Sequence, residues 1–313
     1  MIIRQGKQED IPKIVTLLKE SLGESLLKKS ENVWQYKHLH NSFGPSYVLV
    51  AEENDVIIGV RAFMQWKWQR ENKQFLAYRA VDTATHPQFQ GRGIFSKLTL
   101  QALEEVAKEG ASFIFNTPNE KSRPGYLKMG WQPLGNIALA LVPSFVYVIQ
   151  AFFLKNPLLQ VMNNSELENL CENHNDKCKK TGRLFTPKSV AYLRWRYHNN
   201  PMQTYQVFTG DNWYLALYIK KHNYFKEVRI AEVLGADSNV KRRQIQKVIA
   251  GYAAKNGCLL ISTTDKKLFK LSIYRNFGPI LTFKNLEKGE HMIAEYRDLK
   301  QNWAYSMGDL ELF

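Results

Sequence analysis

The pattern of hydrophobic and polar positions along the chain predicts a mixed α/β structure. Residues 2–4, which begin with two isoleucines, are followed by apolar residues at three- and four-residue spacing over 11–18, which predicts a strand and then an amphipathic helix. The same reasoning predicts a helix over 26–39, hairpin strands over 47–52 and 56–63, a strand over 75–85 and a short buried strand over 111–116.

The most informative stretch runs from Thr83 to Leu98. A threonine-rich extended run reaches Pro87, a turn containing Gly91 and Gly93 follows, and a helical pattern opens immediately afterwards. Glycines let a ligand approach the backbone, and the unpaired first-turn amides of a helix carry the positive end of its dipole. The stretch predicts a site for a pyrophosphate-sized anion, and on its own it is equally compatible with a tight turn that exposes Arg92.

The second half of the chain repeats the first in weaker form. Predicted strands over 213–219 and 228–234 lead to a helix that ends at Gly257, as the earlier helix ends at Gly110. The loop before this second helix, at 235–239, has one glycine and the carboxylate of Asp237, which would repel a diphosphate. We therefore expect a duplicated unit in which only the first copy binds the anion.

Residues 129–154 carry no charged side chain and connect the two copies. Proline, glycine and polar residues interrupt this run, so we favour a strand over 137–142 and an apolar helix over 145–154 rather than a membrane span. The expected organisation is a first domain at 1–142, an apolar linker helix within 143–164 and a second, degenerate domain at 165–313.

Composition and charge change this interpretation little. The chain has 313 residues, 44% of them hydrophobic, and three cysteines, which favours a reducing cytoplasm over a disulfide framework. Cys171, His174 and Cys178 lack a fourth ligand, so we expect no metal site. The net charge is +14, with 25 Lys and Arg against 15 Asp and Glu in 151–313. Such charge could attract an anionic substrate, nucleic acid or a membrane, and does not choose among them.

Two motifs carry a family resemblance. The turn Gln90-Gly-Arg-Gly-Ile-Phe95 is followed, one helix and one strand later, by Asn119-x-x-Ser122-x-x-x-Tyr126-x-x-x-Gly130-Trp131. Together they resemble the GNAT (GCN5-related N-acetyltransferase) superfamily over residues 1 to about 142. The resemblance implies an α/β fold of two GNAT-like units, each a mixed, mostly antiparallel sheet flanked by helices. Their tandem layout resembles that of Fem proteins and N-myristoyltransferases. Phe95 stands where the family usually has Gly or Ala, and we expect its ring to turn into the core.

The resemblance also implies the site residues. Tyr126 would protonate the departing CoA thiolate, or serve as a core aromatic residue. Asp82 is the first candidate for the base, directly or through water, or it forms a structural ion pair with Arg79. Asp309, the carboxylate of Phe313 and water are the other candidates for the base. Asn119 would anchor the cofactor or cap its helix. The implied cofactor-binding residues are Thr83, Ala84, Thr85, Gln90, Gly91, Arg92, Gly93, Ile94, Phe95, Ser96, Asn119 and Ser122.

We expect an acyl-CoA-dependent N-acyltransferase, with acetyl-CoA as donor, that transfers the acyl group directly to the amine of an amino sugar, an amino acid or peptide, or a small molecule. The sequence suggests no Ser-His-Asp or Cys-His set that would form a covalent acyl-enzyme. One alternative is a Fem-like aminoacyl transferase using aminoacyl-tRNA, favoured by Lys241-Arg242-Arg243. The other is a non-catalytic CoA-binding regulator. The acceptor, the acyl chain length and the oligomeric state stay open.

Overall fold

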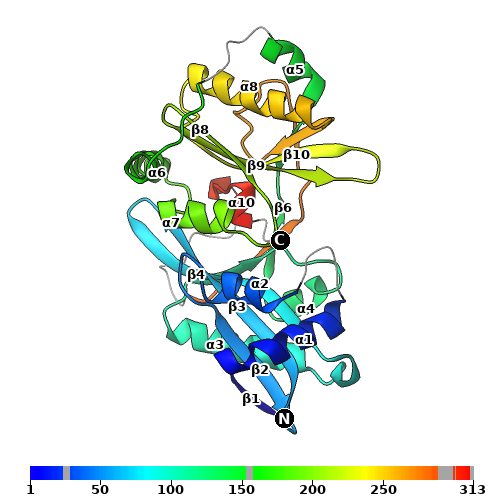
Figure 1. The fold of residues 1–313 in the computed structure, drawn as a ribbon. Helices are drawn as coiled ribbons and strands as arrows, with labels where there is room; N and C mark the ends of the chain where they lie inside the picture. The colour runs from blue at the N-terminus through cyan, green and yellow to red at the C-terminus, as the bar shows by residue number, and fades with distance from the viewer. Residues whose placement is uncertain (24–28, 153–157, 288–298, 300, 311–313) are drawn as a thin grey trace. The chain divides into compact units, whose positions relative to one another are not determined.

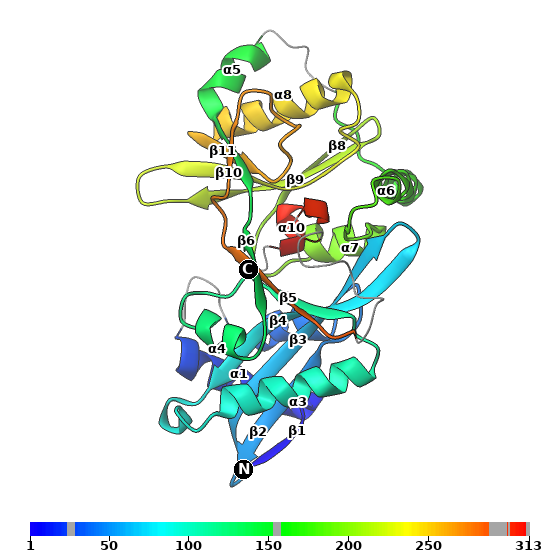
Figure 2. The same cartoon turned by 180° about the vertical axis from the view of Figure 1, so that it is seen from behind.

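The structure is a computed structural model that describes residues 1–23, 29–152, 158–287, 299 and 301–310. The chain divides into two compact units, which are described separately below. The first comprises Met1–Gly135 and Ile280–Asn302, and the second comprises Asn136–Pro279 and Trp303–Leu312 (Figures 1 and 2). No helix among the described residues combines the length and the apolar character needed to cross a bilayer.

The first unit is built on a seven-stranded sheet with the order β1-β2-β3-β4-β5-β13-β6. Its strands are β1 (Ile2–Gln5), β2 (Tyr47–Glu53), β3 (Val56–Arg70), β4 (Lys73–Thr85), β5 (Phe113–Asn116), β13 (Ile280–Asn285) and β6 (Gln132–Asn136). Its helices are η1 (Gln8–Asp10), α1 (Ile11–Leu22), α2 (Glu31–His38), η2 (Pro87–Phe89), α3 (Ile94–Lys108) and α4 (Arg123–Lys128). The strands from β1 to β4 pair antiparallel, whereas β4 and β5 pair in parallel.

Both faces of this sheet are covered, because successive side chains of a strand point to opposite faces. Along β2, Val48 and Val50 pack with α1, whereas Leu49 and Ala51 pack with α3. Figure 2 shows α3 running across the face opposite to the one covered by α1 and α2. The amphipathic patterns of α1 and α3 therefore each supply one layer of the core.

Two irregularities of β4 shape the region before α3. The register with β3 shifts between the pairs Arg61–Thr83 and Ala62–Val81, so Asp82 is an extra residue in a β-bulge. Further, β4 pairs with β5 only over residues 77–79. Beyond Arg79 the two parallel strands diverge, and the second backbone edge of β4 has no strand partner among the described residues.

The second unit contains a six-stranded sheet with the order β12-β7-β11-β10-β9-β8. Its strands are β7 (Leu139–Pro143), β8 (Gln206–Gly210), β9 (Trp213–Lys221), β10 (Lys226–Leu234), β11 (Leu260–Thr263) and β12 (Ile273–Arg275). Its helices are α5 (Ser144–Phe152), α6 (Asn164–Lys179), α7 (Val190–Leu193), the π-helical turn η3 (Arg194–His198), α8 (Asn239–Lys255) and α10 (Met307–Leu310).

The second unit repeats a structural sequence of the first. An antiparallel pair, β9 and β10, has a register shift between Ile230 and Glu232, and α8 then leads to β11, which pairs with β10 in parallel. The first unit has the same order of pair, bulge, helix and parallel strand. The predicted fold class, two mixed sheets flanked by helices, is confirmed.

One strand of the first unit comes from a distant part of the sequence. β13 follows the second unit in the chain but lies between β5 and β6 of the first, where Phe283 pairs with Phe115. β7 belongs to the second unit, where it lies between β12 and β11, although the expected first domain extends to residue 142. Neither compact unit is therefore one continuous stretch, unlike the expected limits of 1–142 and 165–313. The division of function between those ranges stays a prediction.

Several boundaries differ from those expected. The ribbon of β3 and β4 continues to Arg70 and Lys73, beyond the expected strand end at Phe63. The second helix begins at Glu31, because Ser30 caps it by accepting a hydrogen bond from Val33 N (3.3 Å), and residues 24–28 lie outside the described residues. The linker helix is α5, which packs against α8, and residues 153–157 also lie outside the described residues.

Candidate functional site

A pocket of about 460 Å³ opens beside the glycine turn of the first unit. Its lining comes from the C-terminal end of α1, the end of β4, the turn and the start of α3. The lining residues are Ser21, Leu22, Thr83, Ala84, Thr85, Phe89, Gln90, Gly91, Gly93, Ile94 and Phe95. The structure thus brings together eight of the predicted cofactor-binding residues and adds Ser21, Leu22 and Phe89.

The turn has the backbone geometry that its glycines permit. Gly91 and Gly93 have φ angles of +80° and +73°, and a Cβ at either position would meet open space. The first intrahelical hydrogen bond of α3 runs from Lys97 N to Gly93 O (3.0 Å). The amides of residues 94–96 therefore have no acceptor within the helix, and Gly93 offers no side-chain cap. These free donors at a helix N-terminus suit an anion.

Several of the predicted cofactor residues have side-chain partners within the protein. Arg92 forms a bidentate pair with Glu53 (3.0 and 2.7 Å), and Gln90 Nε2 donates to Thr85 O (3.4 Å). Asn119 Oδ1 accepts from the backbone N and the hydroxyl of Ser122 (both 2.9 Å), so Asn119 organises the turn before α4. Arg92, Ser96, Asn119 and Ser122 do not line the pocket.

A buried cluster connects the start of α3 to Tyr126 on α4. The ring of Phe95 turns inward and lies edge-on to Tyr126, with 5.6 Å between ring centroids. Gly125 makes this possible, because a Cβ there would come 2.9 Å from Phe95 Cε1. The Tyr126 hydroxyl accepts hydrogen bonds from Nη1 (2.8 Å) and Nη2 (2.9 Å) of Arg61. Sequence reasoning did not identify Arg61.

Asp82 lies in a second polar cluster, on the face of the sheet covered by α2. Its Oδ2 accepts from Lys37 and from His38 Nε2 (2.9 Å), and His38 Nδ1 contacts Ser46 Oγ at 2.8 Å. A Ser-His-Asp chain, which sequence reasoning did not find, is therefore present. The expected neighbour Arg79 donates instead to Thr117 Oγ1 (3.0 Å). Lys37, His38 and Ser46 are recognised as members of this cluster only from the tertiary structure, which brings them to Asp82.

The charges of this cluster follow from burial and pairing. Burial would raise the pKa of Asp82, but the charge of Lys37 and the hydrogen bond from His38 outweigh it and hold that pKa well below its ordinary value. Burial lowers the pKa of His38, against the opposing effect of Asp82, so its imidazole is neutral. The cluster thus contains an ionised carboxylate beside a neutral imidazole.

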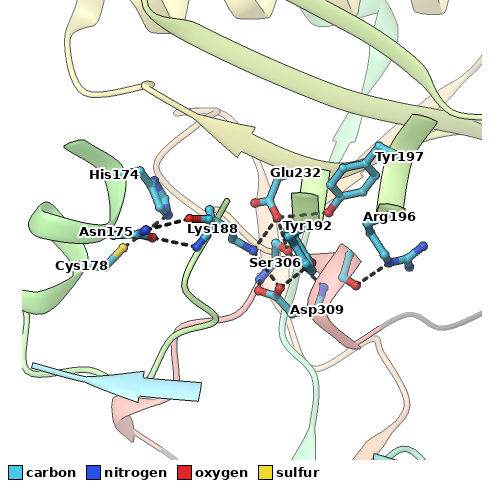
Figure 3. Close-up of polar contacts among 11 residues, drawn as sticks. His174, Asn175, Cys178, Lys188, Tyr192, Arg196, Tyr197, Glu232, Ser306 and Asp309 are labelled. Atoms are coloured by element: carbon cyan, nitrogen blue, oxygen red, sulfur yellow. Dashed lines mark hydrogen bonds and ion pairs between the residues drawn. The ribbon is translucent and has the colours of Figure 1, made fainter. Parts of the chain in front are cut away.

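The alternative base Asp309 lies in the second unit, in a buried network that Figure 3 shows. Lys188 Nζ donates to Asp309 Oδ1 (2.8 Å) and Glu232 Oε2 (2.6 Å), and Tyr192 donates its hydroxyl to Asp309 (2.8 Å). The Asp309 side chain is 2% exposed. Burial lowers the pKa of Lys188, but the two carboxylates raise it by more. The pKa of Lys188 therefore lies above its ordinary value. Asp309 Oδ1 is thus held by two donors inside this network, and Phe313 lies outside the described residues.

Cys178 and His174 lie near this network, with Sγ and Nε2 3.4 Å apart. Burial raises the pKa of Cys171 to about 12 and that of Cys178 to about 11. Burial also lowers the pKa of His174 to about 4. Within the described ranges, no three His, Cys, Asp or Glu side chains are grouped so that they could hold a metal ion.

Comparisons with known proteins agree with this geometry. Residues 2–134 match the family model of the acetyltransferase (GNAT) domain. A GCN5-related N-acetyltransferase from Anabaena variabilis ATCC 29413 has a similar fold, with a TM-score of 0.68 and 14% identity, covering 91% of this chain and 73% of that chain. A GCN5-related N-acetyltransferase from Kribbella flavida also has a similar fold, with a TM-score of 0.67 and 10% identity, covering 91% of this chain and 71% of that chain.

Eis1 from Mycobacterium abscessus is also similar, with a TM-score of 0.55 and 13% identity, covering 91% of this chain and 73% of that chain. At these identities the likeness concerns the fold, and no curated protein matches the chain significantly. The family match falls on the unit that holds the glycine turn, the pocket and Tyr126. Residues 2–134 therefore match the GNAT acetyltransferase domain, and the chain has the fold of these GCN5-related N-acetyltransferases.

Proposed function

We propose that the chain transfers an acetyl group from acetyl-CoA to the amine of an acceptor, by direct attack of the amine on the thioester. The observation that carries this proposal is the pocket at the end of β4, where a strand edge with no strand partner among the described residues leads into the free amides of α3. A linear ligand with amides at one end and a diphosphate at the other matches that order of groups.

The residues present fit acyl-CoA. The backbone of Thr83, Ala84 and Thr85 would pair with the pantetheine amides, because this edge of β4 has no strand partner beyond Arg79 among the described residues. The amides of residues 94–96 would hold the diphosphate. Ser21 supports this assignment, because its hydroxyl is buried without a hydrogen-bond partner in the described chain and lies in the pocket lining. Bound acyl-CoA supplies the activated acyl group.

Tyr126 and Asp82 serve the two proton transfers of the reaction. Tyr126 donates its proton to the departing thiolate, which is the role of a general acid. Asp82 Oδ2 is occupied by Lys37 and His38, which leaves Oδ1 available to the acceptor or to a water in this proposal. A carboxylate with a lowered pKa is a weak base, and Asp82 therefore accepts the proton through water once attack has made the nitrogen acidic.

Binding of acetyl-CoA, measured by calorimetry, tests this proposal. We expect the wild type to bind and Gly93→Trp to lose about 100-fold or more in affinity, because the side chain enters the space over the helix amides. Gly110→Trp is the matched control, since Gly110 also has a positive φ (+88°) and open space but lies at the other end of α3. A folded wild type that does not bind acetyl-CoA would refute the proposal.

The two alternatives have tests of their own. In the basic run at 241–243, Lys241 pairs with Asp237 (3.4 Å) and Arg242 donates to Ala236 O (3.1 Å), so part of its charge is used within the second unit. Steeply salt-dependent RNA binding would support the aminoacyl-tRNA alternative. Turnover of any amine in a panel would exclude the non-catalytic regulator. A cytoplasmic location remains part of the proposal.

A further inference from the structure

Arg61 is a buried cation that the reaction described above does not use. It lies on β3 opposite Thr83, beside the bulge of β4, and its side chain is fully buried. Among the described residues no carboxylate pairs with it. Two of its N–H groups donate to the Tyr126 hydroxyl, and Nε is buried with no partner. Such an arrangement is unusual, because a buried guanidinium normally has an anion beside it.

Aromatic rings surround the rest of the guanidinium. Its central carbon lies 4.8 Å from the ring centroid of Phe63, 5.5 Å from that of Phe95 and 5.1 Å from that of Tyr126. Ring faces attract a cation, but they do not accept its N–H groups as a carboxylate does. Among the described residues, the side-chain oxygen that accepts from the guanidinium is the phenol oxygen of Tyr126, which becomes a full anion when it gives up its proton.

The two hydrogen bonds also fix the direction of the Tyr126 proton. Both donors reach the same phenol oxygen, so they occupy its acceptor positions and leave its own hydrogen directed away from Arg61. In the described part of the chain this hydrogen has no acceptor. Tyr126 is thus oriented as a donor, and its ring contacts Phe95, which also lines the pocket.

We propose that Arg61 is a positioning residue that makes Tyr126 an effective acid. The inference rests on the proposed function. As the C–S bond of the tetrahedral adduct breaks, its electron pair stays on sulfur, and Tyr126 transfers its proton there to give the free CoA thiol. The phenolate left behind is stabilised by the two N–H groups of Arg61 and regains a proton from solvent, while the proton lost by the amine leaves through the base.

A double-mutant cycle tests this assignment in the full-length protein. We expect Arg61→Gln to lower kcat by about 30-fold or more, with the Kd for acetyl-CoA changed less than about threefold, because Arg61 acts on the proton transfer. In the Tyr126→Phe background the same substitution should change kcat less than about twofold. Arg79→Gln is the matched control: Arg79 is also buried, lies over Phe115 (5.8 Å) and donates to Thr117, so it reports the cost of losing a buried arginine.

Rescue by a conservative variant gives a second readout that a structural role would not change. Arg61→Lys, which keeps a charge but loses the two-pronged donor, should recover part of kcat and carries the same test if Arg61→Gln does not fold.

Equal losses of kcat in the wild-type and Tyr126→Phe backgrounds, or an unchanged rate in a folded Arg61→Gln variant, would overturn the inference. Failure of the wild type to bind acetyl-CoA would instead refute the proposed function, so the two failures are distinguishable.

Discussion

Asp82 combines two features that are rare for a residue within a strand. Its φ angle is +32°, and its carboxylate pairs with Lys37 and His38 from a helix more than forty residues away in sequence. A positive φ in a residue other than glycine costs energy, and the β-bulge shows how the structure accommodates it. The bulge turns the carboxylate toward α2, so the strained backbone and the ion pair are parts of one feature.

We expect Asp82→Asn to lower the free energy of unfolding by about 2 kcal/mol at pH 7, less than for a fully buried pair because the Asp82 side chain is 24% exposed. The pKa of Asp82 is lowered in the folded protein. Its contribution is therefore complete above the ordinary aspartate pKa of about 4 and is lost as the pH falls below that value. Urea unfolding of both proteins between pH 7 and pH 3 measures this. A difference that stays constant over the range would contradict it.

At the scale of elements, α3 and α4 fit together through one large and one small residue. Phe95 occupies a position where the family usually has Gly or Ala, and Gly125 provides the space for its ring. The expectation that the Phe95 ring turns into the core is confirmed by its packing against the core cluster of α3. The unusual residue in the loop is therefore explained by a second residue thirty positions later.

Gly125→Ala should destabilise the protein by about 1–2 kcal/mol, because its Cβ would lie 2.9 Å from Phe95 Cε1 and the ring would have to move. In a Phe95→Leu background the same change should be neutral or stabilising by up to about 1 kcal/mol, since alanine is the better helix former. Urea denaturation of the four proteins gives the coupling energy. The absence of coupling would show that the two residues do not compete for the same space.

The element predictions also show which signals can be read locally. Most helices and strands follow from periodicity, because an amphipathic element carries its own two- or 3.6-residue pattern. The extension of β3 was missed although Trp66 and Trp68 alternate with polar residues, and both rings are buried against Phe115, at centroid distances of 6.2 and 5.4 Å. The glycine turn was recognised for the same local reason.

At the scale of the whole molecule, β13 makes the first unit discontinuous in sequence. A fragment of residues 1–142 contains the predicted site but lacks β13. This strand pairs with β5 through four residue pairs, and the ring centroids of Phe283 and Phe113 lie 5.1 Å apart. Without β13 the edge of β5 and part of the core would be exposed to solvent.

We expect the 1–142 fragment to show no cooperative urea transition by circular dichroism, because its sheet is interrupted where β13 belongs. Joining residues 280–287 to its C-terminus through a flexible linker should restore a cooperative transition. The same fusion carrying Phe283→Asp is the control and should not restore it, since a charge would enter the core. Cooperative unfolding of 1–142 alone would show that β13 is dispensable.

The sequence by itself determined the local elements, the glycine turn before α3 and the α/β class, because each rests on residues close together in the chain. The tertiary structure decided which side chains contact one another. Arg61 and Tyr126 are 65 positions apart, His38 and Asp82 are 44, and Asn116 and Thr282 are 166. Such pairs depend on the register between strands and on which helix packs on which face. A local pattern contains no record of either, so the chemistry around Tyr126 and Asp82 became visible only in the folded chain.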